Sequence, residues 1–375
     1  MKQVKQEKQQ YYNISKLLKT NATYRIVFGE RSNGKTFQII LHGLKRNIEN
    51  GTQIAILRRW KEDFKLKYAS TYFDSLVCDG EGKNHVAELT GGKYDKIVYD
   101  SGKWYLAKYD EEQNKNIYAP EPLAYAFALS DMEHGKGNSY PMIRIIFLDE
   151  FMTRKIYLPD EFVLFMNNIS TIVRSRNDVE IFMAANTVSQ YCPYFEEMGL
   201  THVRQMKQGD IDIYKYGNSK LKVAVEYADS PSTGKPSDVY FAFDNPKLQM
   251  ITGGKWELDI YPHLQTKYKD SEVQFRYFVI FKEHILQCNI VARNNEMFTF
   301  IHKKTTELKD QDKDIIFTTE ADQRNNYMGR LTKPTNKLGK KLLWFFVVNK
   351  VFYASNEVGE IMNNYLNWSN NLQKM

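Results

Sequence analysis

One eight-residue loop constrains this chain more than any other feature. Residues 29–36, GERSNGKT, match the phosphate-binding pattern G-x-x-x-x-G-K-[ST]. The apolar segment 24–28 before the loop predicts a buried strand, and residues 36–48 after it are apolar at helical spacing. The same letters on a surface turn would be a chance match, but a strand, a glycine-rich loop and a helix N-terminus together favour a nucleoside triphosphate site.

The loop assigns a role to each kind of residue in it. Glycines allow backbone N–H groups to curl around the phosphates, Lys35 supplies charge to the β and γ oxygens, and the Thr36 hydroxyl suits Mg²⁺. We therefore predict ATP and Mg²⁺ as the ligands. The residues expected to bind the nucleotide are Gly29, Ser32, Asn33, Gly34, Lys35 and Thr36.

A second motif supplies the acids that such a site needs. Residues 145–150, IIFLDE, are four apolar residues followed by two acids. Either a strand simply ends in a charged turn, or Asp149 holds the Mg²⁺ and Glu150 orients or deprotonates a water. The phosphate loop favours the second interpretation. An acid directly after the metal-binding aspartate indicates hydrolysis by an additional-strand ATPase and not phosphotransfer. The chain has no Asn-Lys-x-Asp guanine signature, which argues against a GTP-dependent switch.

Two further positions complete the predicted catalytic set. Asn186 ends the strand predicted at 180–185, where it is either a turn residue or a sensor of the γ-phosphate and the attacking water. Arg174 and Arg176 follow the helix predicted at 160–173. They either complement the helix dipole or act as an arginine finger in a neighbouring subunit's site, which requires a ring or a dimer.

The strand pattern predicts an α/β protein with two domains. Near-continuous apolar strands indicate a parallel sheet buried on both faces. The predicted strands of this sheet are 24–28, 53–59, 143–149 and 180–185. We expect an ATPase domain over 1–228 with a β-hairpin insertion at about 85–110, a linker or lid over 229–268, and a smaller α+β domain over 269–375. The last of these begins with a β-meander over 271–304 and is helical from Lys337 onward.

Composition limits the environment and the partners. The net charge of +7 is compatible with a polyanionic partner without being diagnostic of one. Three widely spaced cysteines fit neither a zinc site nor a disulfide framework, and no apolar run is long enough to span a bilayer, so we expect a soluble intracellular protein. Aromatic residues interleave with basic ones after the second strand, which indicates either a solvated helix face or a nucleic-acid contact. The residues of this segment are Arg58, Arg59, Trp60, Lys61, Phe64, Lys65, Lys67 and Tyr68.

The order of these motifs resembles one family. The blocks 28–36, 57–61, 136–141, 147–151 and 173–176 look, in sequence, like those of the DNA encapsidation ATPase of phi29-type podophages. The resemblance is recognisable over about residues 10–190 and continues more weakly to the C-terminus. The Tyr-Pro before the acid strand and the Arg-x-Arg after it are more specific than the phosphate loop, which many ATPases share.

The resemblance implies a motor. Members of the family form a pentameric ring at the portal vertex of a prohead in the host cytoplasm, are absent from the mature virion, and use ATP to translocate double-stranded DNA. By this resemblance Arg174 is a trans-acting arginine finger and Lys136 couples nucleotide exchange or hydrolysis between subunits. Lys61, with Lys65 near it, belongs to the DNA-facing region, and Arg58 lies near the nucleotide.

The resemblance also describes the C-terminal domain. It implies an RNase H-like nuclease fold that has lost its metal carboxylates and docks on a structured packaging RNA. Residues 275–281 indeed offer no acid where two-metal chemistry would need one. Basic residues would suit a nucleic-acid backbone instead: Lys303, Lys304, Lys333, Lys337, Lys340 and Lys341.

Two other functions remain to be distinguished from packaging. One is a DNA helicase or translocase of the same ATPase class that is not tied to a capsid. The other is a non-enzymatic nucleic-acid-binding protein with a decayed phosphate loop, against which the intact Lys35, Thr36, Asp149 and Glu150 argue.

Overall fold

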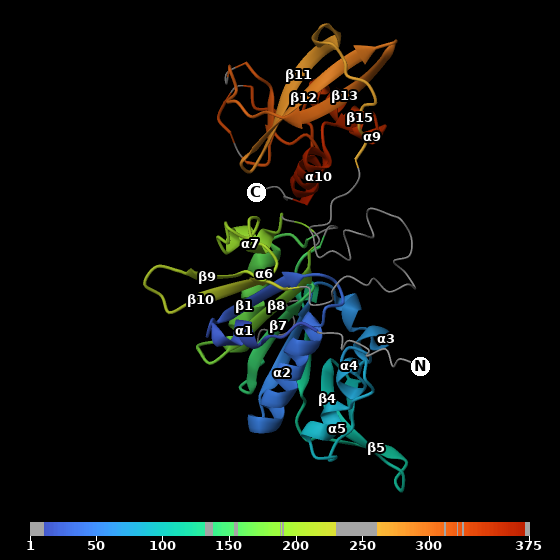
Figure 1. Cartoon of the computed structure of the whole chain (residues 1–375), viewed down its shortest axis with the longest axis vertical. Coiled ribbons are helices and arrows are strands. Elements are labelled where there is room, and N and C mark those ends of the chain that lie inside the picture. The colour runs from blue at the N-terminus through green and yellow to red at the C-terminus, as the bar shows by residue number, and fades with distance from the viewer. Residues whose placement is uncertain are drawn as a thin grey trace, which may run out of the picture. The chain divides into compact units, whose positions relative to one another are not determined.

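The chain divides into two compact units. In this computed structural model they are Met1–Trp256 and Glu257–Met375, which Figure 1 colours blue to yellow-green and orange to red. The linker predicted over 229–268 falls mostly on residues 230–260, which lie outside the described part of the chain. The structure describes residues 11–131, 138–153, 157–187, 189, 191–229, 261–310, 313–320, 322–324 and 326–371.

A ten-stranded sheet organises the first unit and confirms the predicted parallel α/β arrangement (Figure 1). Its centre is parallel, and the strands lie in the order β6 (Ala124–Ala128), β2 (Gln53–Arg58), β7 (Ile143–Asp149), β8 (Glu180–Asn186), β1 (Tyr24–Gly29) and β10 (Lys222–Tyr227). Antiparallel strands extend both edges: β9 (Ile211–Lys215) beside β10, and β4 (Lys103–Asp110) beside β6, followed by β3 (Lys96–Asp100) and β5 (Lys115–Tyr118). The four strands predicted from the sequence are therefore neighbours at the centre of the sheet.

Helices cover both faces of this sheet. Helix α2 (Lys35–Asn50) packs Ile39, Ile40 and Leu44 into the core on one face, together with α1 (Ser15–Lys19). Helix α6 (Glu161–Val173) packs Phe165 and Ile169 into the core on the other face, together with α7 (Pro193–Glu197). Because β1 and β7 are covered on both sides, they are apolar along almost their whole length.

The insertion differs in part from its prediction. Residues 85–89 form helix α5 (His85–Leu89), and only β3 and β4 form the expected hairpin, which turns at Ser101 and Gly102. The helix begins there because the Asn84 side chain accepts a hydrogen bond from Ala87 N at 2.8 Å. Between β2 and α5 the chain forms short helices: η1 (Lys61–Phe64), α3 (Leu66–Ala69) and α4 (Asp74–Val77).

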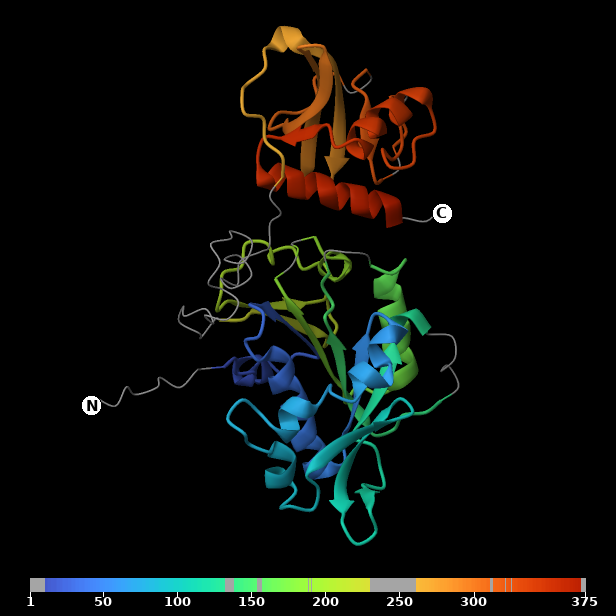
Figure 2. The same ribbon diagram turned by 90° about the vertical axis from the view of Figure 1, so that its right-hand side faces the viewer.

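The second unit is a five-stranded sheet. Its order is β14 (Ile316–Thr318), β11 (Val273–Phe281), β12 (His284–Arg293), β13 (Glu296–Lys303) and β15 (Val351–Tyr353). Strands β11, β12 and β13 are the predicted meander, preceded by the turn η3 (Asp270–Glu272). Figure 2 shows the long helix α10 (Asn356–Asn371) running along this sheet, whereas α9 (Lys337–Val347) is shorter.

The sequence predicted a helical C-terminal end from Lys337 onward, and the structure contradicts this prediction in part. Strand β15 separates α9 from α10, because Val351 and Tyr353 are buried and pair in parallel with β13. None of the helices in the described ranges is both long and apolar enough to cross a membrane.

Candidate nucleotide site

The phosphate loop joins β1 to α2 with backbone that favours glycine. Gly34, which precedes the first residue of α2, has a φ of +95°, in the left-handed region. At Gly29 a side chain would bring its Cβ within 3.1 Å of the Ala228 Cβ. Ser32 also has a positive φ, of +61°, a conformation that in a non-glycine residue clusters at functional sites. The loop therefore encloses the N-terminus of α2, which attracts anions.

Lys35 lies buried within this loop. Its Nζ donates hydrogen bonds to the Glu30 carbonyl oxygen at 2.6 Å and to Asn33 Oδ1 at 3.0 Å. Burial lowers the pKa of Lys35 to about 8, against the smaller opposing effect of Glu30 and Asp149. A triphosphate at the loop would supply the negative charge that this ammonium lacks.

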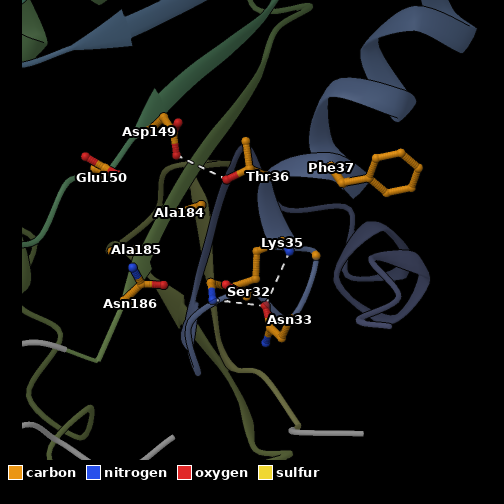
Figure 3. Close-up of a pocket in the computed structure, with 11 residues that line it drawn as sticks. Ser32, Asn33, Lys35, Thr36, Phe37, Asp149, Glu150, Ala184, Ala185 and Asn186 are labelled. Atoms are coloured by element: carbon orange, nitrogen blue, oxygen red, sulfur yellow. Dashed lines mark hydrogen bonds between the residues drawn. The ribbon is translucent and has the colours of Figure 1, made fainter. Parts of the chain in front are cut away.

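The two acids end β7 beside the loop. Figure 3 shows Asp149 facing Thr36 across the pocket, and the Thr36 hydroxyl lies 3.3 Å from Asp149 Oδ1. Burial raises the pKa of Asp149, and Arg58 opposes that rise. Glu150 has a φ of +57° and a side chain that is 59% exposed, so the turn after β7 directs one acid inward and the next toward solvent.

Arg58, at the end of β2, bridges both acids. Its Nη1 lies 2.9 Å from Asp149 Oδ2 and its Nη2 lies 2.8 Å from Glu150 Oε2. The family resemblance implied that Arg58 lies near the nucleotide, and the structure places its side chain on the two carboxylates. Parallel strands β2 and β7 are neighbours, so their carboxyl ends meet at one edge of the sheet, where ligands bind in open α/β folds.

A pocket of about 270 Å³ lies between the phosphate loop, the acids at the end of β7 and the end of β8 (Figure 3). Asn186, at the end of β8, lines it and pairs in register with Gly29 of β1. The strand after the acid strand therefore brings an amide to the phosphate loop, and the sensor role of Asn186 stays a prediction. The other lining residues are Ser32, Asn33, Gly34, Lys35, Thr36, Phe37, Asp149, Glu150, Ala184 and Ala185.

The polar groups of the pocket fit a nucleoside triphosphate with its Mg²⁺ ion. The buried Asn33 Nδ2 finds no hydrogen-bond partner within the described residues, although Asn33 Oδ1 is engaged by Lys35. A buried amide donor without a partner is costly, and a phosphate oxygen would satisfy it. The Thr36 hydroxyl and the Asp149 carboxylate are the hard oxygen ligands that Mg²⁺ prefers.

Arg174 lies outside this cluster. It is exposed at the C-terminal end of α6, with a φ of +53°, and its Nη2 donates to the Asn138 carbonyl oxygen at 2.8 Å. Arg176 instead donates to the carbonyl oxygens of Tyr140, Pro141 and Ile143, and so fixes the loop before β7. Lys136 falls outside the described residues.

The basic segment after β2 is exposed at Lys61, Lys65 and Lys67 and at two of its aromatic side chains, whereas Arg58 is half-buried and Arg59 is buried. Lys61 Nζ pairs with Asp131 Oδ2 at 2.7 Å, yet its side chain is 71% exposed. Lys65 is exposed, as are Leu66 and Tyr68, whereas Phe64 packs against the buried Trp104. The segment thus presents cations beside apolar and aromatic surface while one aromatic side chain anchors it.

The C-terminal lysines differ in their surroundings. Lys340 and Lys341 are exposed on α9 near the half-exposed Trp344. Lys303 Nζ pairs with Glu357 Oε1 at 2.5 Å, and Lys304 Nζ donates to Thr306 Oγ1 at 2.7 Å. Of the predicted nucleic-acid set, Lys337, Lys340 and Lys341 are therefore the members exposed on one helix, α9.

Sequence reasoning missed one residue of the site. The Tyr72 hydroxyl donates to Asp149 Oδ2 at 3.0 Å from a turn that lies 77 residues earlier in the chain. No local pattern around Tyr72 indicates this contact, because it depends on how the segment after β2 folds back toward β7.

Known proteins match both the sequence and the fold. The chain shares 27% identity over 217 residues with the DNA packaging protein of Bacillus phage B103, covering 57% of each chain. It shares 29% identity over 192 residues with the DNA packaging protein of Bacillus phage phi29, covering 50% of each. The matched region thus spans little more than half the length of these relatives.

Solved structures agree on the fold. A chain of the phi29 viral genome packaging motor assembly matches 96% of this chain and 99% of its own length, with a TM-score of 0.55 and 20% identity. A chain of the Phi-28 gp11 DNA packaging motor matches 98% of this chain and all of its own length, with a TM-score of 0.50 and 17% identity.

A family model covers most of the sequence. It is described as Podovirus DNA encapsidation protein (Gp16), and it matches residues 6–96 and 111–361. The chain belongs to the Podovirus DNA encapsidation protein (Gp16) family.

Proposed function

We propose that this chain is an ATP-hydrolysing motor that translocates double-stranded DNA into a phage prohead. Membership of the encapsidation family supports the purpose, and the pocket between the phosphate loop and Asp149 supports the chemistry. The observation that carries the proposal is the meeting of Lys35, Thr36, Asp149 and Glu150 around one pocket in a chain of this family.

The order of strands supports the additional-strand class of ATPase. Strand β8 lies between β1, which carries the phosphate loop, and β7, which carries the acids. In this arrangement Asn186 lines the pocket from β8, where it would contact the γ-phosphate. Glu150, exposed to solvent beside the buried Asp149, would orient and deprotonate the attacking water.

The chain's own groups divide the work of hydrolysis. Lys35 and the backbone N–H groups of residues 32–36 bind the β and γ phosphates and hold the reacting bond in place. Thr36 and Asp149 would hold Mg²⁺, which supplies neutralisation of the charge on those phosphate oxygens. Arg58 keeps both acids in position before the nucleotide binds.

Assembly and DNA contact complete the motor. Arg174 is exposed at the end of α6 and does not line the nucleotide pocket of its own subunit. This position supports a role as an arginine finger for a neighbouring subunit. The subunits would form a ring, which we take to be a pentamer. Lys136 would couple the subunits. The exposed lysines Lys61 and Lys65 beside Leu66 and Tyr68 form the surface that we assign to the DNA backbone.

The second unit is the nucleic-acid-binding domain of the proposal. A three-stranded meander flanked by the parallel strands β14 and β15 supports an RNase H-like fold without nuclease chemistry. Lys340 and Lys341 on α9, with Lys303 and Lys304 near the end of β13, would contact a structured packaging RNA at the portal vertex of the prohead. The motor would thus work in the host cytoplasm and leave before the virion is mature.

The decisive experiment measures Mg²⁺-dependent ATP hydrolysis by the purified chain with DNA alone, and with DNA, packaging RNA and proheads together. We expect turnover to rise only in the complete mixture, and nuclease protection to report DNA inside the shell. Lys35→Ala should abolish both. Full stimulation by DNA alone would instead indicate a helicase or translocase not tied to a capsid, and no turnover under any condition would contradict the ATPase.

A further inference from the structure

Tyr72 contacts the predicted metal-binding acid without lining the nucleotide pocket. It lies in the turn between α3 and α4, and its hydroxyl donates to Asp149 Oδ2 at 3.0 Å. Tyr72 instead lines a second pocket of about 280 Å³, together with Arg58, Phe64 and Tyr68. The Arg58 and Tyr72 side chains therefore approach Asp149 from that second pocket, while the phosphate loop faces Asp149 across the first.

The two oxygens of the Asp149 carboxylate have different partners. Oδ2 accepts hydrogen bonds from Arg58 Nη1 at 2.9 Å and from Tyr72 at 3.0 Å. Oδ1 faces Thr36 Oγ1 at 3.3 Å. Since two protein donors occupy Oδ2, Oδ1 is the oxygen that is presented to a cation beside the phosphate loop.

The Tyr72 ring is held in one place. It packs against Phe73 and Trp104, with ring centroids 5.2 and 5.8 Å away, and both of those side chains are buried. The packing therefore fixes the hydroxyl where it donates to Asp149 Oδ2.

We propose that Tyr72 is a positioning residue for the nucleotide site, which turns the Asp149 carboxylate so that Oδ1 meets Mg²⁺ beside Thr36. This inference rests on the proposed ATPase function. In many proteins a residue that hydrogen-bonds to a metal ligand fixes the orientation of that ligand. The loss of such a residue costs about 10- to 100-fold in metal affinity or activity. Tyr72 follows the exposed segment of Lys61–Tyr68 by four residues, so the orientation of Asp149 also depends on how that segment is folded.

The test compares two single-atom deletions in the same aromatic cluster. Tyr72→Phe removes the hydroxyl on Asp149. Tyr99→Phe removes a hydroxyl that donates to the Phe64 carbonyl oxygen at 2.9 Å, from a ring 4.9 Å from Trp104, and so is the matched control. Mn²⁺ binding to the protein with a non-hydrolysable ATP analogue, followed by electron paramagnetic resonance, reports the metal site directly. Analogue affinity in EDTA reports the phosphate loop alone.

We expect Tyr72→Phe to weaken Mn²⁺ binding about 10-fold or more, and to raise the Mg²⁺ concentration for half-maximal ATPase activity in parallel. Analogue affinity in EDTA should stay at the wild-type value, and Tyr99→Phe should match the wild type throughout. Equal metal affinity in the two variants would overturn the role of Tyr72 while leaving the ATPase intact. A wild-type chain that binds neither the analogue nor Mn²⁺ with it would overturn the proposed function, and this inference with it.

Discussion

Arg58 and Asp149 end neighbouring parallel strands, and Arg58 Nη1 lies 2.9 Å from Asp149 Oδ2. The same guanidinium reaches Glu150 Oε2 with its Nη2 at 2.8 Å. One permanently charged fork thus holds the two acids to which we assign metal binding and water activation. Burial raises the pKa of Asp149, and Arg58 is the first charge that opposes this rise.

The pH profile of turnover should therefore depend on Arg58. In Arg58→Gln the opposing charge is gone, so the pKa of Asp149 rises further and the carboxylate takes up its proton at a higher pH. Activity is lost as pH falls through that pKa, and we expect the acid limb of kcat/KM to move to higher pH. Arg46→Gln, whose arginine pairs with Glu180, is the control. An acid limb in Arg58→Gln at the wild-type position would contradict the prediction.

The adjacent arginine should matter for stability instead. Arg59 forms a two-pronged ion pair with Glu161, at 2.6 and 2.8 Å, and its Nη2 also donates to the Phe151 carbonyl oxygen. Removing one member of such a buried pair leaves an uncompensated charge and costs about 3–5 kcal/mol. Arg59→Met should lower the free energy of unfolding of the first unit by that order, measured by urea titration.

The exposed ion pair of Lys61 and Asp131 supplies the comparison for Arg59. Lys61→Met should leave the unfolding free energy near the wild-type value, because exposed pairs contribute little. If Arg59→Met unfolds at the same urea concentration as Lys61→Met, the pair with Glu161 is not stabilising.

The predictable part of the fold is the part with local signals. Strands β1 and β7 and helices α2 and α6 have either continuous apolar runs or clear helical spacing, and the sequence placed each within about a residue or two of its observed ends. Strand β10 was missed although it is the neighbour of β1 and has a short apolar run of its own from Val223 to Val225, since it is only six residues long and polar residues flank that run.

The same distinction holds for the site. The motifs alone sufficed to predict that the phosphate loop and the acid pair share one pocket, because both lie at the ends of parallel strands. Tyr72 could not be predicted in this way, since its contact spans 77 residues, which include helices α4 and α5 and strands β3 to β6. The start of α5 was within reach, because Asn84 is a preferred residue at a helix N-cap.

Nucleotide binding should weaken as pH rises through about 8. The pKa of Lys35 is lowered to about 8 by burial, so the ammonium that faces the phosphates loses its proton above that pH. The bound triphosphate favours the charged form, and binding at pH 8.5 should therefore take up protons from the buffer. Calorimetry in two buffers of different ionisation enthalpy measures this uptake.

A variant that stays charged is the control for Lys35. Lys35→Arg keeps its charge throughout this range, so whatever affinity it retains should not fall between pH 7 and pH 9. A wild-type affinity that is equally flat over the range would contradict the role of the Lys35 proton.

Lys61 should contribute to DNA binding through charge alone. Its side chain is 71% exposed beside other cations of the same segment. Lys61→Ala should weaken binding to all DNA sequences alike and reduce the slope of log affinity against log salt by about one unit. Lys83→Ala, which breaks an exposed pair with Glu88 elsewhere on the unit, should leave the slope as it is. An unchanged slope in Lys61→Ala would remove this residue from the DNA surface.

Arg174 should act on a neighbouring subunit, and mixed rings can test this. Arg174→Ala and Glu150→Gln subunits are each expected to be inactive alone. In a mixed ring, a Glu150→Gln subunit can offer its intact Arg174 to the intact Glu150 of an Arg174→Ala neighbour, so part of the ATPase activity should return. Lys35→Ala mixed with Glu150→Gln is the control, because no subunit then has a competent pocket. An absence of recovery in rings shown to be mixed would place Arg174 outside the neighbour's site.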